Sequence, residues 1–162
     1  MLLREQFKEI EAWRTGGAVP ARNIAWKKPS FLRNNDGTKI LPPSVGEIHA
    51  SRHGNDGDRN TSAVACYEYA WTYEVDFLEP LTIRKVVVHF GNGYPTEGEA
   101  FAVEPETGRE ISLGRLSDGK GESWTLTVDP VKCCSVRIRS YKPDGPDQPG
   151  GQMAVAELEV YE

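Results

Sequence analysis

The sequence contains no run of about 18 consecutive apolar residues, the length that a membrane-spanning helix needs. The N-terminal stretch MLLREQFKEIEAWRT is interrupted by charges throughout, so it does not have the pattern of a secretory signal peptide. These absences leave the localisation unknown. Two alternatives stay open: a cytoplasmic protein, or an extracellular or periplasmic piece of a longer secreted protein.

An excess of positive charge is also missing. The chain has 19 Lys and Arg residues against 24 Asp and Glu residues, which gives a formal net charge of −5. Proteins that bind nucleic acids generally present a basic surface to the phosphates. The composition therefore argues against a nucleic-acid partner.

Cysteine is scarce, with only Cys66, Cys133 and Cys134. No CxxC pair or Cys/His spacing is present, so the sequence does not predict a zinc site. Neighbouring cysteines rarely bridge each other. Strand alternation groups Cys134 with Val136 and Ile138, which predicts that Cys134 is buried and that Cys133 points outward. A disulfide between Cys66 and Cys134 stays open as an alternative.

The motifs of common enzymes are absent as well. The sequence has no GxSxG turn, no phosphate-binding loop, no HExxH and no dinucleotide-binding glycine pattern. The three histidines, His49, His53 and His89, do not stand at metal-ligand spacing, and His89 falls within a predicted strand. The sequence therefore carries none of these enzyme signatures.

Turn-forming residues and short alternating segments are what the sequence has in quantity. It contains 16 glycines and 11 prolines, a composition typical of many turns that join short strands. Alternating apolar residues predict strands in 71–77, 83–90, a hairpin over 101–113, 124–130, 134–141 and 155–162. Seven or eight strands without an intervening helix favour an antiparallel sandwich or barrel.

Two segments carry predictions of side-chain direction. In 71–77, one face holds the apolar side chains of Trp71, Tyr73, Val75 and Phe77. In 83–90, alternation places Ile83 and Val87 opposite Val86 and Val88. The second segment therefore has the pattern of a strand that is buried on both sides.

The first 20 residues differ from the rest. Leu3, Phe7 and Ile10 recur at helical spacing, and Gly16 and Gly17 end the pattern. We expect a short amphipathic helix or linker over 1–20 that packs on its own domain or on a neighbouring one. The β domain is expected to span 21–162.

Four pieces of the chain, in this order, resemble one known superfamily. They are ARNIAWKKPS, NDGDRNT, WTYEVDFLEPLTIRKVVVHF and the closing AELEVYE. Together they resemble the discoidin, or coagulation-factor type C, superfamily of galactose-binding-like domains, which includes bacterial carbohydrate-binding modules and fucose-binding lectins. The resemblance covers about residues 21–162. It implies an eight-stranded antiparallel β-sandwich of the jelly-roll type.

The resemblance also implies a structural calcium ion beside the NDGD stretch. Calcium takes six to eight oxygen ligands from carboxylates, hydroxyls and carbonyls. Matched to the family motif, side-chain oxygens are expected from Asp56, Thr61 and Glu157. Backbone carbonyls are expected from His53, Asp58, Thr61 and Ala156.

The function that the resemblance implies is that of a non-catalytic carbohydrate-binding module, an accessory domain of a larger glycan-processing protein. Its partner would be a glycan, such as the terminal sugar of a polysaccharide or glycoprotein, and the domain would be monomeric or part of a longer chain. The loops that match the sugar-binding loops hold Glu47, His49, Arg52, Asn92, Tyr94 and Tyr141. Polar contacts are expected from Arg52 and Asn92, and stacking from Tyr94 or Tyr141.

The chain departs from the family in two places, and alternatives stay open. Galactose-binding members often carry a Trp-His pair after the calcium motif and an arginine after the long strand, and both are missing here, so galactose specificity is not expected. A protein- or lipid-binding module is one alternative, with Phe31, Leu32 and Arg33 as an exposed spike beside Trp26 and two lysines. The acidic composition makes a membrane partner the weaker prediction. A scaffold domain that packs on a catalytic domain is the other alternative.

Overall fold

The computed structural model describes residues 22–42, 50–65, 70–142 and 153–162. The predicted N-terminal helix lies outside these residues. The described chain is almost entirely β-structure, with antiparallel pairing throughout, and no helix in it is long and apolar enough to cross a membrane. Its elements are β1 (Ser30–Asn34), the 3₁₀ turn η2 (Ser51–Gly54), β2 (Trp71–Phe90), β3 (Glu97–Val103), β4 (Glu110–Leu116), β5 (Trp124–Lys142) and β6 (Val155–Tyr161).

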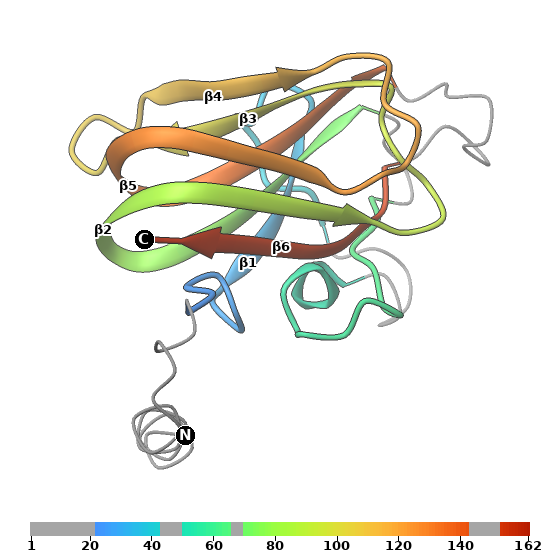
Figure 1. Ribbon diagram of the computed structural model, residues 1–162, viewed down its shortest axis with the longest axis horizontal. Coiled ribbons are helices and arrows are strands. Elements are labelled where there is room, and N and C mark those ends of the chain that lie inside the picture. Colours follow the sequence, from blue (N-terminus) through green and yellow to red (C-terminus); the bar gives the residue numbers. More distant parts are fainter. Residues whose placement is uncertain (1–21, 43–49, 66–69, 143–152) are drawn as a thin grey trace, which may run out of the picture.

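The two long strands β2 and β5 pair with each other and bend together. Figure 1 shows both ribbons turning back at the same end of the molecule, so that each strand contributes to two layers. The order in one layer is β1–β2–β5–β3–β4, and β6 adds to the other half of β2. The fold is therefore an antiparallel β-sandwich, as predicted.

The core lies between the layers and draws on both halves of β2. Trp71, Tyr73, Val75 and Phe77 are all fully buried, which confirms the predicted alternation. They share one cluster with Leu158 and other residues of β6. Each such side chain contributes about 1.5 to 3 kcal/mol of transfer free energy.

Strand count is where the sequence prediction and the structure differ. Six strands are described instead of eight, because segments 71–77 and 83–90 are both parts of β2, and segments 124–130 and 134–141 are both parts of β5. The hairpin over 101–113 is confirmed as β3 and β4. A bend within a strand leaves no turn residues that would mark it in the sequence.

The predicted direction of Ile83 is wrong. Ile83 is fully buried in the same cluster as Val86 and Val88, although simple alternation places it on the other face. The register between β2 and β5 shifts between Ile83 and Lys85, as at a β-bulge. Here Val131 pairs with Ile83 and Thr127 with Lys85, so two additional residues of β5 interrupt the regular ladder beside Ile83.

The prediction for the cysteine pair is also wrong. Cys133 is fully buried in the core, whereas Cys134 is half-buried and its Sγ lies 3.6 Å from the carbonyl oxygen of Val103. Both are free thiols, so Cys134 does not form a disulfide, and Cys66 lies outside the described residues. The cysteines lie at the bend, where Leu81 pairs with Cys133 and Asp76 with Ser135, so that four residues of β2 stand opposite one residue of β5.

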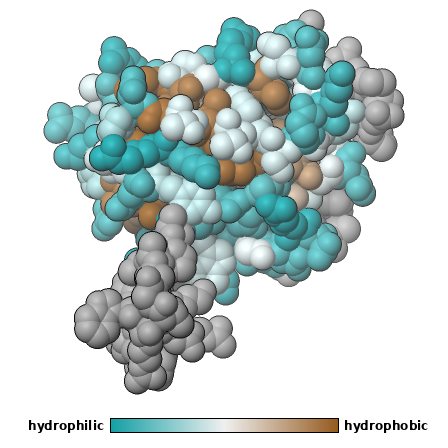
Figure 2. Space-filling model, in the orientation of Figure 1, coloured by the Kyte–Doolittle hydropathy of each residue, from teal (hydrophilic) through white to brown (hydrophobic). Residues whose placement is uncertain are grey.

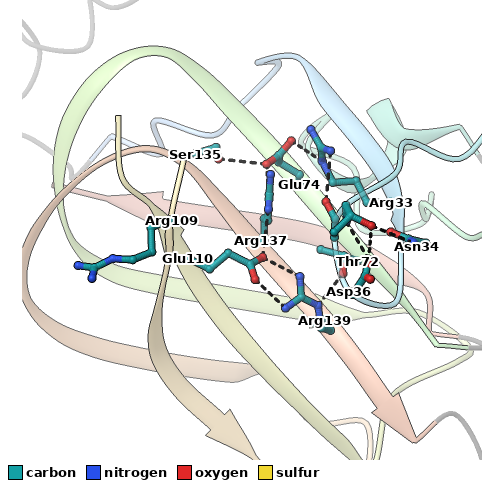
Figure 3. Close-up of polar contacts among 12 residues, drawn as sticks. Arg33, Asn34, Asp36, Thr72, Glu74, Arg109, Glu110, Ser135, Arg137 and Arg139 are labelled. Atoms are coloured by element: carbon teal, nitrogen blue, oxygen red, sulfur yellow. Dashed lines mark hydrogen bonds and ion pairs between the residues drawn. The ribbon is translucent and has the colours of Figure 1, made fainter. Parts of the chain in front are cut away.

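A chain of alternating charges crosses the outer face of the β1–β2–β5–β3–β4 layer (Figure 3). Arg33 and Arg137 both bind the Glu74 carboxylate, and Arg137 and Arg139 both bind Glu110. The Glu74 side chain is only 5 % exposed. Removing one partner of such a buried pair leaves an uncompensated charge, so the network ties the four strands together.

The predicted lipid-binding spike at 31–33 is not exposed as expected. Leu32 is 5 % exposed and faces the core from β1, and Arg33 is occupied by Glu74. The exposed side of β6, β2 and β5 likewise shows small apolar areas interrupted by polar residues (Figure 2). The lipid-binding alternative therefore loses Leu32 and Arg33, whereas Trp26 and Lys27 remain exposed.

The bulge at Ile83 gives a direct test of the fold. We expect Ile83→Ala to lower the free energy of unfolding by about 2 to 5 kcal/mol, because it opens a cavity in the core. The matched control is Leu78→Ala, since Leu78 is 70 % exposed, and surface changes usually stay within about 0.5 kcal/mol. Urea denaturation measures both. Equal, small effects would show that Ile83 is not in the core.

Candidate functional site

The segment 50–65 closes the side of the sandwich between β1 and β6. Its 3₁₀ turn η2 contacts both strands, and Ala63 forms a β-bridge with Val155 at the start of β6. The buried Tyr73 donates from its hydroxyl to the Ser51 carbonyl at 2.9 Å. The loop that follows η2 is thus held against the core at both ends. In Figure 1 it lies below β6.

Four oxygen atoms crowd together in this loop. The Thr61 hydroxyl lies 2.6 Å from Asp56 Oδ2, 3.0 Å from the Asp58 carbonyl and 3.4 Å from the His53 carbonyl. A hydroxyl has one proton and can donate one hydrogen bond at full strength. The Asp58 carbonyl also accepts the backbone N–H of Thr61 at 3.3 Å, and His53 Nδ1 lies 3.2 Å from Asp56 Oδ2. The hydroxyl still contacts more oxygens than its single proton can serve, an arrangement that suits a hard cation.

The surroundings of Asp56 favour the ionised form of its carboxyl group. Burial opposes its charge, but bonds from the Thr61 hydroxyl, the Asp58 backbone N–H and His53 outweigh burial and hold the pKa of Asp56 below its usual value. The Asp58 carboxylate instead accepts the N–H of Asn60 at 2.9 Å. Within the loop, Asp56 therefore supplies the inward-facing charge, and Asp58 contributes its carbonyl.

Glu157 brings a second carboxylate to the loop from β6. Its Oε2 accepts the backbone N–H of Gly57, 100 residues away, at 3.0 Å. Its Oε1 is buried and has no hydrogen-bond partner among the described residues. Burial raises the pKa of Glu157 to about 7; the Gly57 N–H opposes this, and the Asp56 carboxylate adds to it. A buried carboxylate oxygen without a partner is costly unless a proton or a cation satisfies it.

Ala156 is the extra residue of a register shift in β6. His89 pairs with Glu157 and Phe90 pairs with Val155, so Ala156 has no partner in the β2–β6 ladder. The additional residue of a bulge is left out of the ladder hydrogen bonds. Its carbonyl is therefore released for another partner, next to Glu157.

The structure thus brings the predicted calcium ligands to one loop and the adjoining strand end. The set holds two carboxylates, and its other members are a hydroxyl and backbone carbonyls. Among the described residues there is no group of three or more His, Cys, Asp or Glu side chains that could hold a metal ion. A site of this composition fits an oxygen-seeking cation better than a transition metal, which prefers imidazole or thiolate.

A second polar cluster beside the loop was not predicted. His89, which is 8 % exposed, contacts Ser123 Oγ through Nδ1 at 2.6 Å and Glu159 through Nε2. Arg59 reaches to the same Nε2, at 2.6 Å, from the loop that follows η2, residues 55–62, which we call the oxygen-rich loop. The order is the reverse of a serine-hydrolase triad, in which serine meets Nε2. The cluster instead anchors the loop to β2 and β6 through Arg59.

The predicted sugar-binding residues lie in different parts of the structure. Asn92 is exposed after the end of β2, and Tyr141 is half-buried at the end of β5, near the start of β3. Arg52 is exposed on η2. Glu47 and His49 lie outside the described residues.

Tyr94 is placed differently from a surface platform. It is 8 % exposed, and a Cβ atom at Gly121 would lie 2.9 Å from its ring, so the ring packs under the β4–β5 loop. Little of its ring faces solvent, which leaves a small surface for a sugar to stack on. The role of Tyr94 in stacking stays a prediction.

No protein-family model matches the sequence, and no curated protein matches it. Solved structures, in contrast, share the fold. Chitosan-binding module 1 from a chitosanase/glucanase of Paenibacillus sp. IK-5 superposes with a TM-score of 0.71 at 15% identity, over 87% of this chain and 99% of that one. The family 32 carbohydrate-binding module of Clostridium perfringens NanJ, solved with galactose, gives a TM-score of 0.62 at 19% identity, over 83% and 93%. A fucose-binding module of Streptococcus pneumoniae gives 0.61 at 16% identity, over 87% and 95%. These similarities confirm the galactose-binding-like fold.

The raised pKa of Glu157 predicts how stability depends on pH in metal-free protein. The folded chain holds its proton up to about pH 7, whereas the unfolded chain releases it near its ordinary pKa of 4.5. The stability that the Glu157 carboxyl group contributes is therefore fully present below pH 4.5, and it is lost as the pH rises through 7. We expect Glu157→Gln to melt several degrees higher than the wild type at pH 8 in chelator, and equally at pH 4.5. Glu106→Gln, on an exposed turn, is the control. Parallel pH profiles for wild type and Glu157→Gln would contradict the assignment.

Proposed function

We propose that this domain is a non-catalytic carbohydrate-binding module, an accessory domain of a larger glycan-processing protein. The observation that carries the proposal is the fold. It is shared along nearly the full length of both chains with modules whose descriptions name chitosan, galactose and fucose as ligands. Low sequence identity leaves the sugar itself open.

The sugar-binding surface that we propose is the end of the sandwich where β2 and β5 finish and β3 begins. Tyr141 donates from its hydroxyl to Glu99 at 2.8 Å, and the Arg115 guanidinium lies 5.2 Å from the centre of its ring. Ser112 also donates to Glu99, at 2.6 Å. A fixed aromatic ring next to planar hydrogen-bonding groups suits a sugar, which offers C–H groups on one face and hydroxyls at its edge. Asn92 adds an exposed amide at this end.

We further propose that the oxygen-rich loop holds a structural calcium ion. Asp56, Thr61 and Glu157 would supply side-chain oxygens, and His53, Asp58 and Ala156 would supply carbonyls. The crowded oxygens and the unpartnered Glu157 oxygen support this, because a divalent cation would satisfy both. When bound, the ion would supply charge neutralisation and would tie the loop to the last strand.

Glycan binding tests the function. We expect the wild type to bind a subset of glycans on an array, and both Asn92→Ala and Tyr141→Ala to weaken that binding roughly threefold to tenfold, as for the loss of one or two hydrogen bonds. Glu106→Ala, in the hairpin turn at the opposite end of β3, should bind as the wild type does. Absence of binding to every glycan would favour the scaffold alternative.

Calcium is tested by melting temperature with calcium and with chelator. Calcium at 100 times its Kd should stabilise the fold by about 2.7 kcal/mol. We expect Asp56→Ala and Glu157→Ala to abolish this rise, and Asp129→Ala, an exposed carboxylate on β5, to retain it. The same melting temperature in calcium and chelator for the wild type would count against the ion.

A further inference from the structure

Trp26 is an exposed aromatic residue that the proposed sugar site does not use. It is 38 % exposed and is one of three large hydrophobic side chains exposed among the described residues, together with Ile40 and Leu78. It lies on the turn before β1, beside the oxygen-rich loop, where the two segments are neighbours in Figure 1. Trp26 is far from Asn92 and Tyr141 in the sequence, and its printed side-chain hydrogen bond is to the oxygen-rich loop.

The indole is held in place and does not simply protrude. Its Nε1 lies 3.4 Å from the Asp56 carbonyl. Gly57 has a positive φ of 84°, and a Cβ atom there would lie 2.9 Å from the same nitrogen. Glycine thus allows the loop backbone to pack against the edge of the ring.

The backbone around Trp26 is locked as well. Asn55, which is 1 % exposed, donates from its side chain to the carbonyls of Ala25 and Lys28, each at 2.8 Å, and its own carbonyl accepts the N–H of Lys27. Lys27 adopts a positive φ of 57°, which is unfavourable for a residue with a side chain. A buried amide and a strained residue thus maintain a turn that presents Trp26 to solvent.

Positive charge accompanies the ring. The Lys27 ammonium lies 4.8 Å from the ring centre, within the range of a cation–π contact. Among the described residues, neither Lys27 nor Lys28 forms an ion pair with a carboxylate. An aromatic face and uncompensated ammonium groups therefore lie together on an otherwise acidic chain.

We infer that Trp26 and Lys27 form a second glycan contact, one that takes a sugar carrying a carboxylate or a sulfate. The C–H face of the sugar would pack on the indole, and the ammonium would turn to the anionic substituent. The inference rests on the proposed carbohydrate-binding function. An anionic membrane fits less well, because membrane binding needs several exposed apolar side chains together, and Trp26 is the one large apolar side chain exposed on this turn.

The test compares binding of an oligogalacturonate with that of a neutral oligosaccharide of similar length, by titration calorimetry on the full chain. We expect Trp26→Ala to weaken oligogalacturonate binding by about tenfold or more, and Trp26→Phe to restore most of it, since a ring remains. Lys27→Ala should remove the preference for the charged sugar and the salt dependence of binding, without affecting the neutral one. Leu78→Ala is the control for an exposed apolar side chain.

The possible failures are distinguishable. If Trp26→Ala and Lys27→Ala bind both sugars as the wild type does, while Asn92→Ala and Tyr141→Ala do not, the second contact is absent and the proposed function stands. If the wild type binds no glycan, both proposals fail. Binding of acidic liposomes that depends on Trp26, without oligosaccharide binding, would overturn the inference in favour of a membrane. A large fall in melting temperature for Trp26→Ala, with binding of the folded fraction unchanged, would make Trp26 a packing residue only.

Discussion

The paired bend of β2 and β5 is the constraint on which the rest of the structure depends. The two strands stay hydrogen-bonded to each other on both sides of the bend, so they cross from one layer to the other as a pair. All other strands pair with one of them or extend the sheet from there. Because both layers share the same two strands, a single core forms between them, and both ends of the sandwich receive loops from fixed strand ends. The proposed sugar site uses one of these ends.

The oxygen-rich loop depends on this frame for its chemistry. Its second carboxylate comes from Glu157, which β6 delivers by pairing with the second half of β2. Burial, with a smaller contribution from the neighbouring Asp56 carboxylate, raises the pKa of Glu157 to about 7. The bonds that shape the loop also reach outward, because Asn55 and Gly57 fix the turn that carries Trp26. One loop thus links the proposed ion site to an exposed ring.

Sequence reasoning succeeded where side chains alternate without interruption. Trp71 to Phe77 lie on a regular strand, and every predicted core residue there is buried. It failed at Ile83 and Cys133, which lie where the pairing of β2 with β5 is irregular. A bulge is a property of two strands, since it depends on how one fits the other, and a single strand's pattern does not contain it. The His89 cluster was missed for a similar reason: its members are separated by 30 to 70 residues, and their polar types are common in loops.

The sequence by itself determined the fold class and the identity of the oxygen-rich loop, because both depend on local patterns: alternation for the strands, and a short acidic, glycine-rich stretch for the loop. The tertiary structure alone decided that Arg59 connects that loop to His89, and which side chains are exposed. It buried Leu32 and Tyr94, paired Arg33 with Glu74, and left Trp26 in solvent. The physical reason is that burial and charge pairing depend on what packs against a residue, and in this fold those neighbours come from strands distant in the chain.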